Sequence, residues 1–211
     1  EIRGMYILSA MGPPGGGRSE ISERTQSRFN LINMTFPSDE QITRIFGTMI
    51  NQKLQSFDES VKPIGLTITK ATLEVYQSVI ERFLPTPAKI HYLFNLRDIS
   101  KVFQGLLRAN KDYHDTSTAM IRLWVHEIYR VFSDRLNNEK DSEAFHQLVN
   151  TKLGSLFDTT FHAICPSKTV PIFCDFMNPN GVFEDFEEVG KLKAYMEEQL
   201  EDYNLSPGVV S

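Results

Sequence analysis

Two prolines near the middle of the chain separate one helical segment from the next. Pro85 and Pro87 lack a backbone amide donor, and each pushes the residue before it out of the helical region. Apolar residues recur at helical spacing after them, and these are Ile99, Val102, Phe103, Leu106 and Leu107. The stretch therefore predicts a new helix that begins near Asn95. The Asn95 side chain can cap the first free amides, and Asp98 adds a carboxylate in the first turn.

Arg97 lies in the first turn of this predicted helix, at the end where the helix dipole disfavours a cation. The residues alone leave two interpretations open. Arg97 is either an ordinary surface arginine or an arginine held at this position to bind an anion.

Other helices are expected before and after this stretch. Ser38 and Gln41 have the spacing of a capping box, and an amphipathic pattern follows them as far as Leu54. The remaining predicted helices cover residues 69–84, residues 121–132, a segment that Asp141 or Ser142 would cap, and residues 183–203.

Short apolar runs rich in strand-forming residues occur at residues 5–11 and 29–36. The glycine-rich segment 12–18 follows the first run, but it matches neither a Walker A loop nor a dinucleotide fingerprint. A further short strand is expected within residues 170–173. A strand pair followed by five or six helices predicts a fold that is mainly α with a small α/β part.

Composition and spacing exclude several classes of site. A net charge of −5 and no basic cluster argue against nucleic-acid binding, and no apolar run approaches the roughly 20 residues of a membrane span. The five histidines lack metal-binding spacing, and the carboxylates of residues 175–188 miss the calcium-loop pattern, so they are expected in a solvated helix start. Cys165 and Cys174 are expected as buried thiols. No catalytic set and no metal site is predicted.

Several motifs together resemble the dynein heavy chains. They are Ala10–Arg18, Arg28–Asn30, Leu84–Asp98, Leu123–Glu127, Asp175–Met177 and Asp202–Asn204. More narrowly, the chain is similar to the third AAA+ module of an axonemal heavy chain. The resemblance implies the C-terminal strand pair of an AAA+ large subdomain in residues 1–54, a helical AAA+ lid in residues 55–182, and a helix and linker toward the next module in residues 183–211.

The resemblance also implies roles for three arginines. Arg97 matches the second-sensor arginine, which reaches from the lid to the γ-phosphate of a bound nucleotide. Arg28, and after it Arg24, matches the region of the arginine finger that acts on a neighbouring module. Two positions depart from the family pattern: Met11-Gly12 stands where many modules have the first-sensor asparagine, and Ser27 replaces an arginine.

The function that the resemblance implies is that of a regulatory part of an ATP-driven microtubule motor of cilia and flagella. Walker A and Walker B motifs are absent from these residues, so the segment alone is not expected to hydrolyse ATP. It would need no cofactor by itself, whereas the intact module would hold ATP or ADP with Mg²⁺. Expected partners are the neighbouring AAA+ modules and, through the parent, microtubules and dynein light and intermediate chains, with no nucleic acid and no membrane.

The expected location is the cytoplasm and cytoskeleton, in the axoneme. An alternative from another class is a stand-alone helical protein-interaction domain, in which Arg97 only pairs with Asp98 or another nearby carboxylate.

Overall fold

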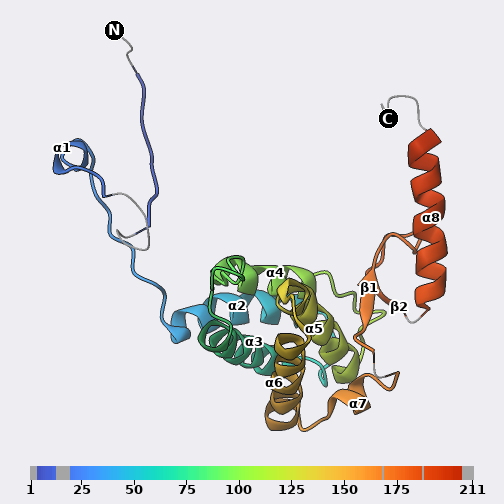
Figure 1. Cartoon of the computed structure of the whole chain (residues 1–211). Coiled ribbons are helices and arrows are strands. Elements are labelled where there is room, and N and C mark those ends of the chain that lie inside the picture. The colour runs from blue at the N-terminus through green and yellow to red at the C-terminus, as the bar shows by residue number, and fades with distance from the viewer. Residues whose placement is uncertain (1–3, 13–19, 168, 187, 206–211) are drawn as a thin grey trace. The chain divides into compact units, whose positions relative to one another are not determined.

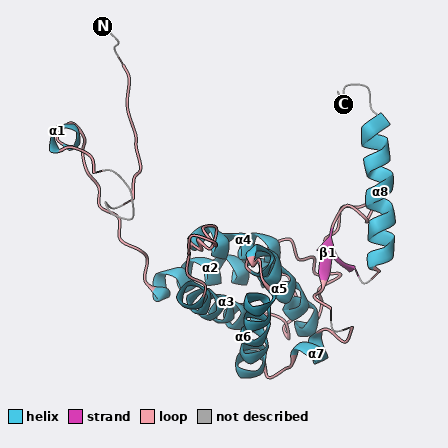
Figure 2. Cartoon of the chain, viewed as in Figure 1, coloured by secondary structure: helices cyan, strands magenta, loops and turns pink. Residues whose placement is uncertain are grey.

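The chain is mainly helical in its computed structural model, which describes residues 4–12, 20–167, 169–186 and 188–205 (Figure 2). The predicted fold class is confirmed. The chain divides into two compact units, Glu1–Pro37 and Ser38–Ser211, and each is described by itself.

The described elements follow one another from helix α1 to helix α8 (Figure 1). They are α1 (Glu23–Gln26), α2 (Asp39–Leu54), α3 (Ile64–Arg82), α4 (Leu96–Leu106), α5 (Ser117–Val131), the 3₁₀ turn η1 (Ser133–Arg135), α6 (Glu139–Phe157), α7 (Phe161–Ile164), β1 (Ile172–Cys174), β2 (Glu184–Phe186) and α8 (Val189–Leu205).

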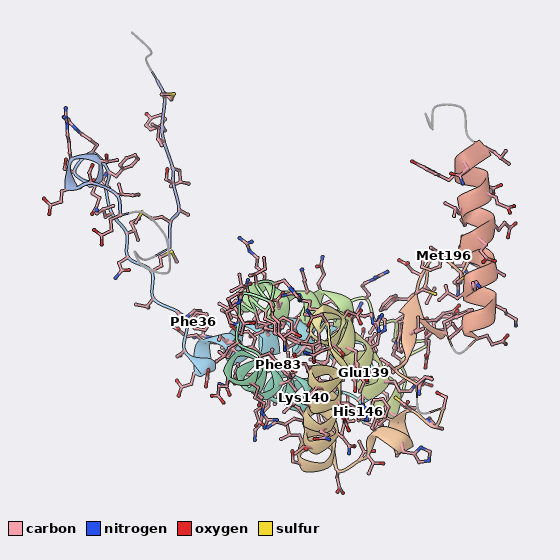
Figure 3. All side chains as sticks on the ribbon, in the orientation of Figure 1. Phe36, Phe83, Glu139, Lys140, His146 and Met196 are labelled. Atoms are coloured by element: carbon pink, nitrogen blue, oxygen red, sulfur yellow. The ribbon has the colours of Figure 1, made fainter. Side chains whose placement is uncertain are left out.

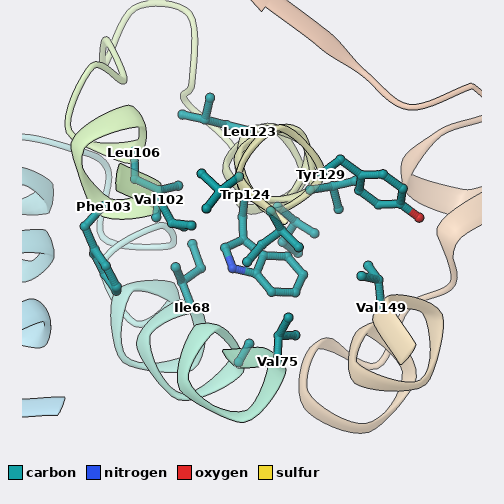
Figure 4. Close-up of a cluster of buried hydrophobic side chains, with 14 of the residues drawn as sticks. Ile68, Val75, Val102, Phe103, Leu106, Leu123, Trp124, Tyr129 and Val149 are labelled. Carbon is teal, nitrogen blue, oxygen red and sulfur yellow. The ribbon is translucent and has the colours of Figure 1, made fainter. Parts of the chain in front are cut away.

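The core of the second unit forms where α3, α4, α5 and α6 meet (Figure 4). Trp124 of α5 is fully buried at its centre, as its size and apolar neighbours predict. Its indole Nε1 donates to Thr72 Oγ1 over 2.9 Å, so the one polar atom of the ring is satisfied inside the core. On the other side of α4, Phe103 stacks on Phe46 of α2 with ring centroids 4.7 Å apart.

Helix starts follow local capping chemistry. The predicted capping box at Ser38 is confirmed, because Ser38 Oγ accepts from Gln41 N at 3.3 Å and Gln41 Oε1 accepts from Ser38 N at 2.9 Å. Asn138, and neither Asp141 nor Ser142, caps α6, since its side chain accepts from Asp141 N at 2.7 Å. The predicted cap of α6 was therefore three or four residues too late.

The two strands predicted near the N-terminus are absent from the described residues 4–12 and 20–37. Most side chains of residues 5–11 and 29–36 are exposed, and the two runs do not pair with each other. A strand needs a neighbouring strand to pair its backbone N–H and C=O groups, so apolar composition alone did not produce one. Residues 13–18 of the glycine-rich segment lie outside the described residues.

An antiparallel pair of strands instead lies near the C-terminus, where β1 pairs with β2 in the register Phe173 to Asp185. The strand expected within residues 170–173 thus begins two residues later and ends one residue later, at 172–174. Gly181 has φ +63° in the connecting turn, a conformation that glycine adopts without strain. The last helix was predicted from residue 183, but it begins only at Val189 because β2 occupies residues 184–186.

The pairing also corrects the expectation of a solvated carboxylate cluster. Asp185 of β2 accepts from Arg122 Nε of α5 at 2.6 Å, and Asp175 pairs with Arg108. These two carboxylates therefore attach the strands to the helical core. Helix α8 contains no buried residue, and Met196 is one of its exposed apolar side chains (Figure 3).

Helix α2 packs against α3 and belongs to the second compact unit, which begins at Ser38. The predicted subdomain boundary between residues 54 and 55 falls between these two packed helices. It stays a prediction about family subdomains, as does the boundary at residue 183. Among the described residues, no helix combines the length and apolar character needed to cross a membrane.

Candidate functional site

The N-terminus of α4 is fixed by a complete capping box. Asn95 Oδ1 accepts from Arg97 N at 2.8 Å, and Asp98 Oδ2 accepts from Asn95 N at 2.8 Å. The first turn thus satisfies part of its own free amides, as the sequence predicts. The Arg97 amide is therefore held by the Asn95 side chain, and the Asn95 amide by the Asp98 side chain.

The Arg97 side chain extends to the surface from this fixed turn. Arg97 is exposed, and its guanidinium forms no ion pair with any residue in the described part of the chain. An exposed guanidinium keeps its charge and five donors, so it is able to bind an anion such as a phosphate oxygen pair.

Asp98 points the opposite way and is 2% exposed. Both of its oxygens are bound by the guanidinium of Arg135: Nη2 to Oδ1 in a short contact, and Nη1 to Oδ2 at 3.3 Å. Asp98, one of the carboxylates that the alternative function offered to Arg97, is therefore paired with Arg135 instead. Adjacent residues at the start of a helix point in different directions, and here one is exposed while the other is buried.

Arg135 belongs to the junction between α5 and α6, residues 135–141, which we call the corner. Its Nη1 also donates to the Leu93 carbonyl at 3.3 Å, and its own carbonyl lies 3.0 Å from His91 Nε2. The guanidinium lies over the ring of Phe94, 5.3 Å from its centroid. The segment before α4 and the corner are thus joined at several points.

A second set of contacts joins the same two segments. The buried Tyr92 places its hydroxyl 2.9 Å from Asp141 Oδ2, and Asn137 N donates to that hydroxyl at 3.2 Å. Lys89 forms a short ion pair with the same Asp141. The Lys89 ammonium lowers the pKa of the Asp141 carboxyl, because it favours the charged form. Residues 89–98, which we call the sensor loop, therefore rest on the corner.

A shallow hollow of about 150 Å³ adjoins the sensor loop. It is lined by Ile80, Phe83, Pro85, Tyr92, Leu93 and Phe94. This lining offers apolar contact but no cation. The described residues hold no group of three or more side chains that could bind a metal ion.

The two candidate finger arginines lie in the first unit. Arg24 is on α1 and Arg28 follows it, and both are exposed. Ser22 caps α1, since its Oγ accepts from Thr25 N at 3.3 Å. Both side chains are accessible for a contact with another molecule or module.

Two buried titratable residues of α5 lie away from Arg97, on the side of the helix that meets α4 and β1. Burial lowers the pKa of His126 to about 4, so the imidazole is neutral at pH 7, and its Nδ1 lies 3.0 Å from the Pro171 carbonyl oxygen. Burial raises the pKa of Glu127 to about 7, against the opposing effect of Arg108 and Arg130. The two groups belong to the packing between elements.

Comparison with known protein families shows which proteins this chain is similar to. The model of the AAA+ lid domain matches residues 68–164, and the model of the P-loop containing dynein motor region matches residues 1–37. Dynein axonemal heavy chain 2 of Mus musculus is 64% identical over 209 residues, which are 99% of this chain and 5% of that protein.

The chain is homologous to a segment of the axonemal dynein heavy chains. The human dynein axonemal heavy chain 2 is 63% identical over 209 residues, again 99% of this chain and 5% of that protein. The dynein-1-beta heavy chain, flagellar inner arm I1 complex, of Chlamydomonas reinhardtii is 42% identical over 212 residues, 98% of this chain and 5% of that protein. The chain thus spans about a twentieth of the length of the curated relatives it matches.

Within this dynein segment, Arg97 lies inside the part matched by the AAA+ lid, and Arg24 and Arg28 lie inside the part matched by the motor region. The role of Arg135 was missed from the sequence. Its partner Asp98 lies 37 residues away, a separation that no helical period encodes. The only available signal was an acidic residue on the apolar side of α4, which needs a buried partner.

Proposed function

We propose that this chain forms the lid of a regulatory AAA+ module in an axonemal dynein heavy chain, and that Arg97 senses the nucleotide bound by that module. The observation that carries the proposal is an exposed guanidinium, without an ion-pair partner in the described residues, on a turn fixed by a capping box and a buried ion pair. Such an arginine is available to a γ-phosphate and presented from a rigid base.

The motif resemblance supports placing this module third in the ring. The parent would hydrolyse ATP to move along microtubules, with Mg²⁺ and ATP or ADP in the intact module, in the axoneme of a cilium or flagellum. The segment itself carries no Walker A or Walker B motif and would not hydrolyse ATP alone. Arg28, and after it Arg24, would serve as the finger toward a neighbouring module.

The proposed sensor makes a direct prediction for the intact heavy chain. Arg97→Ala should lower the preference for a non-hydrolysable ATP analogue over ADP by about tenfold to a hundredfold, because it removes a charge-assisted contact to the γ-phosphate. The measurement is a pair of nucleotide titrations in a heavy chain whose other nucleotide sites are disabled.

The matched control is Lys101→Ala, which removes an exposed cation one turn further along α4. It should leave the nucleotide preference unchanged. An Arg97→Ala heavy chain that retains the wild-type preference would refute the sensor role and favour a helical interaction domain.

A further inference from the structure

The sensor loop and the corner form one connected unit although they are far apart in the sequence. Arg135 is bonded to Asp98 and to the Leu93 carbonyl, and Asp141 is bonded to Lys89 and Tyr92. Arg135 lies at the end of η1, which follows α5, and Asp141 lies in the first turn of α6, so the sensor loop is attached to the segment that joins these two helices.

The Asp98 carboxylate makes two sets of hydrogen bonds in this unit. One oxygen accepts the Asn95 amide, which starts α4, and both oxygens accept from Arg135. The side chain of Asp98 is 3% exposed, so these partners take the place of water around its carboxylate. Loss of Arg135 would leave a buried carboxylate without its counter-charge, and Asp98 would then move toward solvent. That movement disturbs the cap next to Arg97.

The guanidinium fork of Arg135 suits this position better than an ammonium would. It reaches both Asp98 oxygens and the Leu93 carbonyl at once, while its face covers Phe94. Those contacts need a planar group with several donors in fixed directions. The position therefore depends on arginine geometry as well as on positive charge.

We propose that Arg135 is a positioning residue for Arg97: through Asp98 and the Leu93 carbonyl it fixes the first turn of α4, and so the direction in which Arg97 meets a phosphate. The inference rests on the proposed function of Arg97. It adds that the nucleotide contact is supported by the α5–α6 junction, so that a shift of Arg97 is coupled to α6.

The test is a double-mutant cycle in the same intact heavy chain and with the same nucleotide titrations. Arg135→Leu should lower the preference for the ATP analogue over ADP by roughly tenfold, because a misplaced contact loses much of its strength. Combined with Arg97→Ala, it should cause no further loss, since Arg135 acts through Arg97. If Arg135 had only a general structural role, the losses of preference caused by the two substitutions would multiply.

Arg135→Lys covers the case in which Arg135→Leu does not fold. Lysine keeps the charge beside Asp98 but not the fork, so a folded Arg135→Lys chain should show a partial loss of the same preference. Lys152→Met is the matched control, because it removes another ion pair between helices, Lys152 with Glu74 at 2.8 Å, far from the sensor loop in sequence. It should leave the preference unchanged.

The outcomes separate the two proposals. If Arg97→Ala lowers the preference while folded Arg135→Lys and Arg135→Leu do not, or if the losses multiply, the positioning role is wrong and the sensor role stands. If Arg97→Ala itself has no effect, the proposed function fails, whatever the Arg135 variants do.

Discussion

At the scale of single residues, the buried polar groups of α5 carry the clearest consequences. Glu127 is 8% exposed, and its carboxyl lies against Gly105 of α4, where a Cβ would come within 1.9 Å of Glu127 Cδ. The Glu127 carboxyl therefore occupies the space that a side chain at position 105 would need, and the close contact between α4 and α5 at Gly105 also buries Glu127. Both can be tested through the stability of the chain.

Gly105→Ala should destabilise the chain by about 1–3 kcal/mol, because the added methyl group must displace the Glu127 carboxyl. Urea unfolding measures the change. Gly47→Ala is the control: its Cβ would meet nothing closer than 3.9 Å, so the variant should be neutral or slightly stabilised. Equal losses for the two variants would contradict the close contact described for Gly105.

The raised pKa of Glu127 gives a pH dependence with a defined sign. The folded state holds a proton on Glu127 up to about pH 7, whereas the unfolded state loses it near 4.5, so this group lowers stability as pH rises between those values. His126 acts in the opposite direction between about pH 4 and 6.5, since its folded pKa is depressed. The two effects partly cancel in the wild type.

Glu127→Gln should separate the contribution of Glu127 to the pH dependence of stability from that of His126. The unfolding free energy of the variant minus that of wild type should be near zero at pH 4.5 and grow to about 3 kcal/mol by pH 7.5, because glutamine mimics the protonated carboxyl. Urea titrations across this range provide the values. Glu198→Gln, at an exposed position, should show no such trend, and a flat difference for Glu127→Gln would rule out the raised pKa.

At the scale of elements, local chemistry was predictable and distant pairing was not. The capping box at Ser38 and the start of α4 at Asn95 depend on residues within one turn, so the sequence contains all the information. The start of α6 was misjudged because several polar residues near 138–142 could each act as a cap. The β1–β2 pair was missed in part because apolar runs show strand propensity but not strand partners.

The candidate site shows the same division. Arg97 was chosen as a candidate from a motif and its place in a helix start, both of which are local features. Arg135 and Asp141 were not, because their roles depend on contacts 37 and 52 residues away in the chain. Charge and spacing along the sequence give no measure of which surfaces meet after folding.

At the scale of the whole molecule, the second unit contains the described core. The buried hydrophobic residues lie between Ile42 and Phe183, and α1 contains none. A chain of residues 38–211 should therefore unfold cooperatively, with a urea midpoint close to that of residues 1–211, because it keeps all of this buried apolar surface. Circular dichroism during urea titration would check this expectation.

Removal of α2 as well, in a chain of residues 55–211, is the informative comparison. It deletes Phe46, which stacks on Phe103, and the rest of a helix packed on α3. That chain should lose its cooperative transition or shift it strongly to lower urea. Similar behaviour of the two truncated chains would mean that α2 is not part of the folding unit.

The double use of the Asp98 carboxylate has a consequence for hydrogen exchange. Helix ends usually fray, and their amides exchange with solvent through small local openings. The first turn of α4 cannot open without releasing Asp98 from Arg135, and with it a contact to the end of another helix. The amides of this turn and those of the α5–α6 junction should therefore exchange with solvent through one shared opening. The beginning of α4 should then be as protected from exchange as its middle.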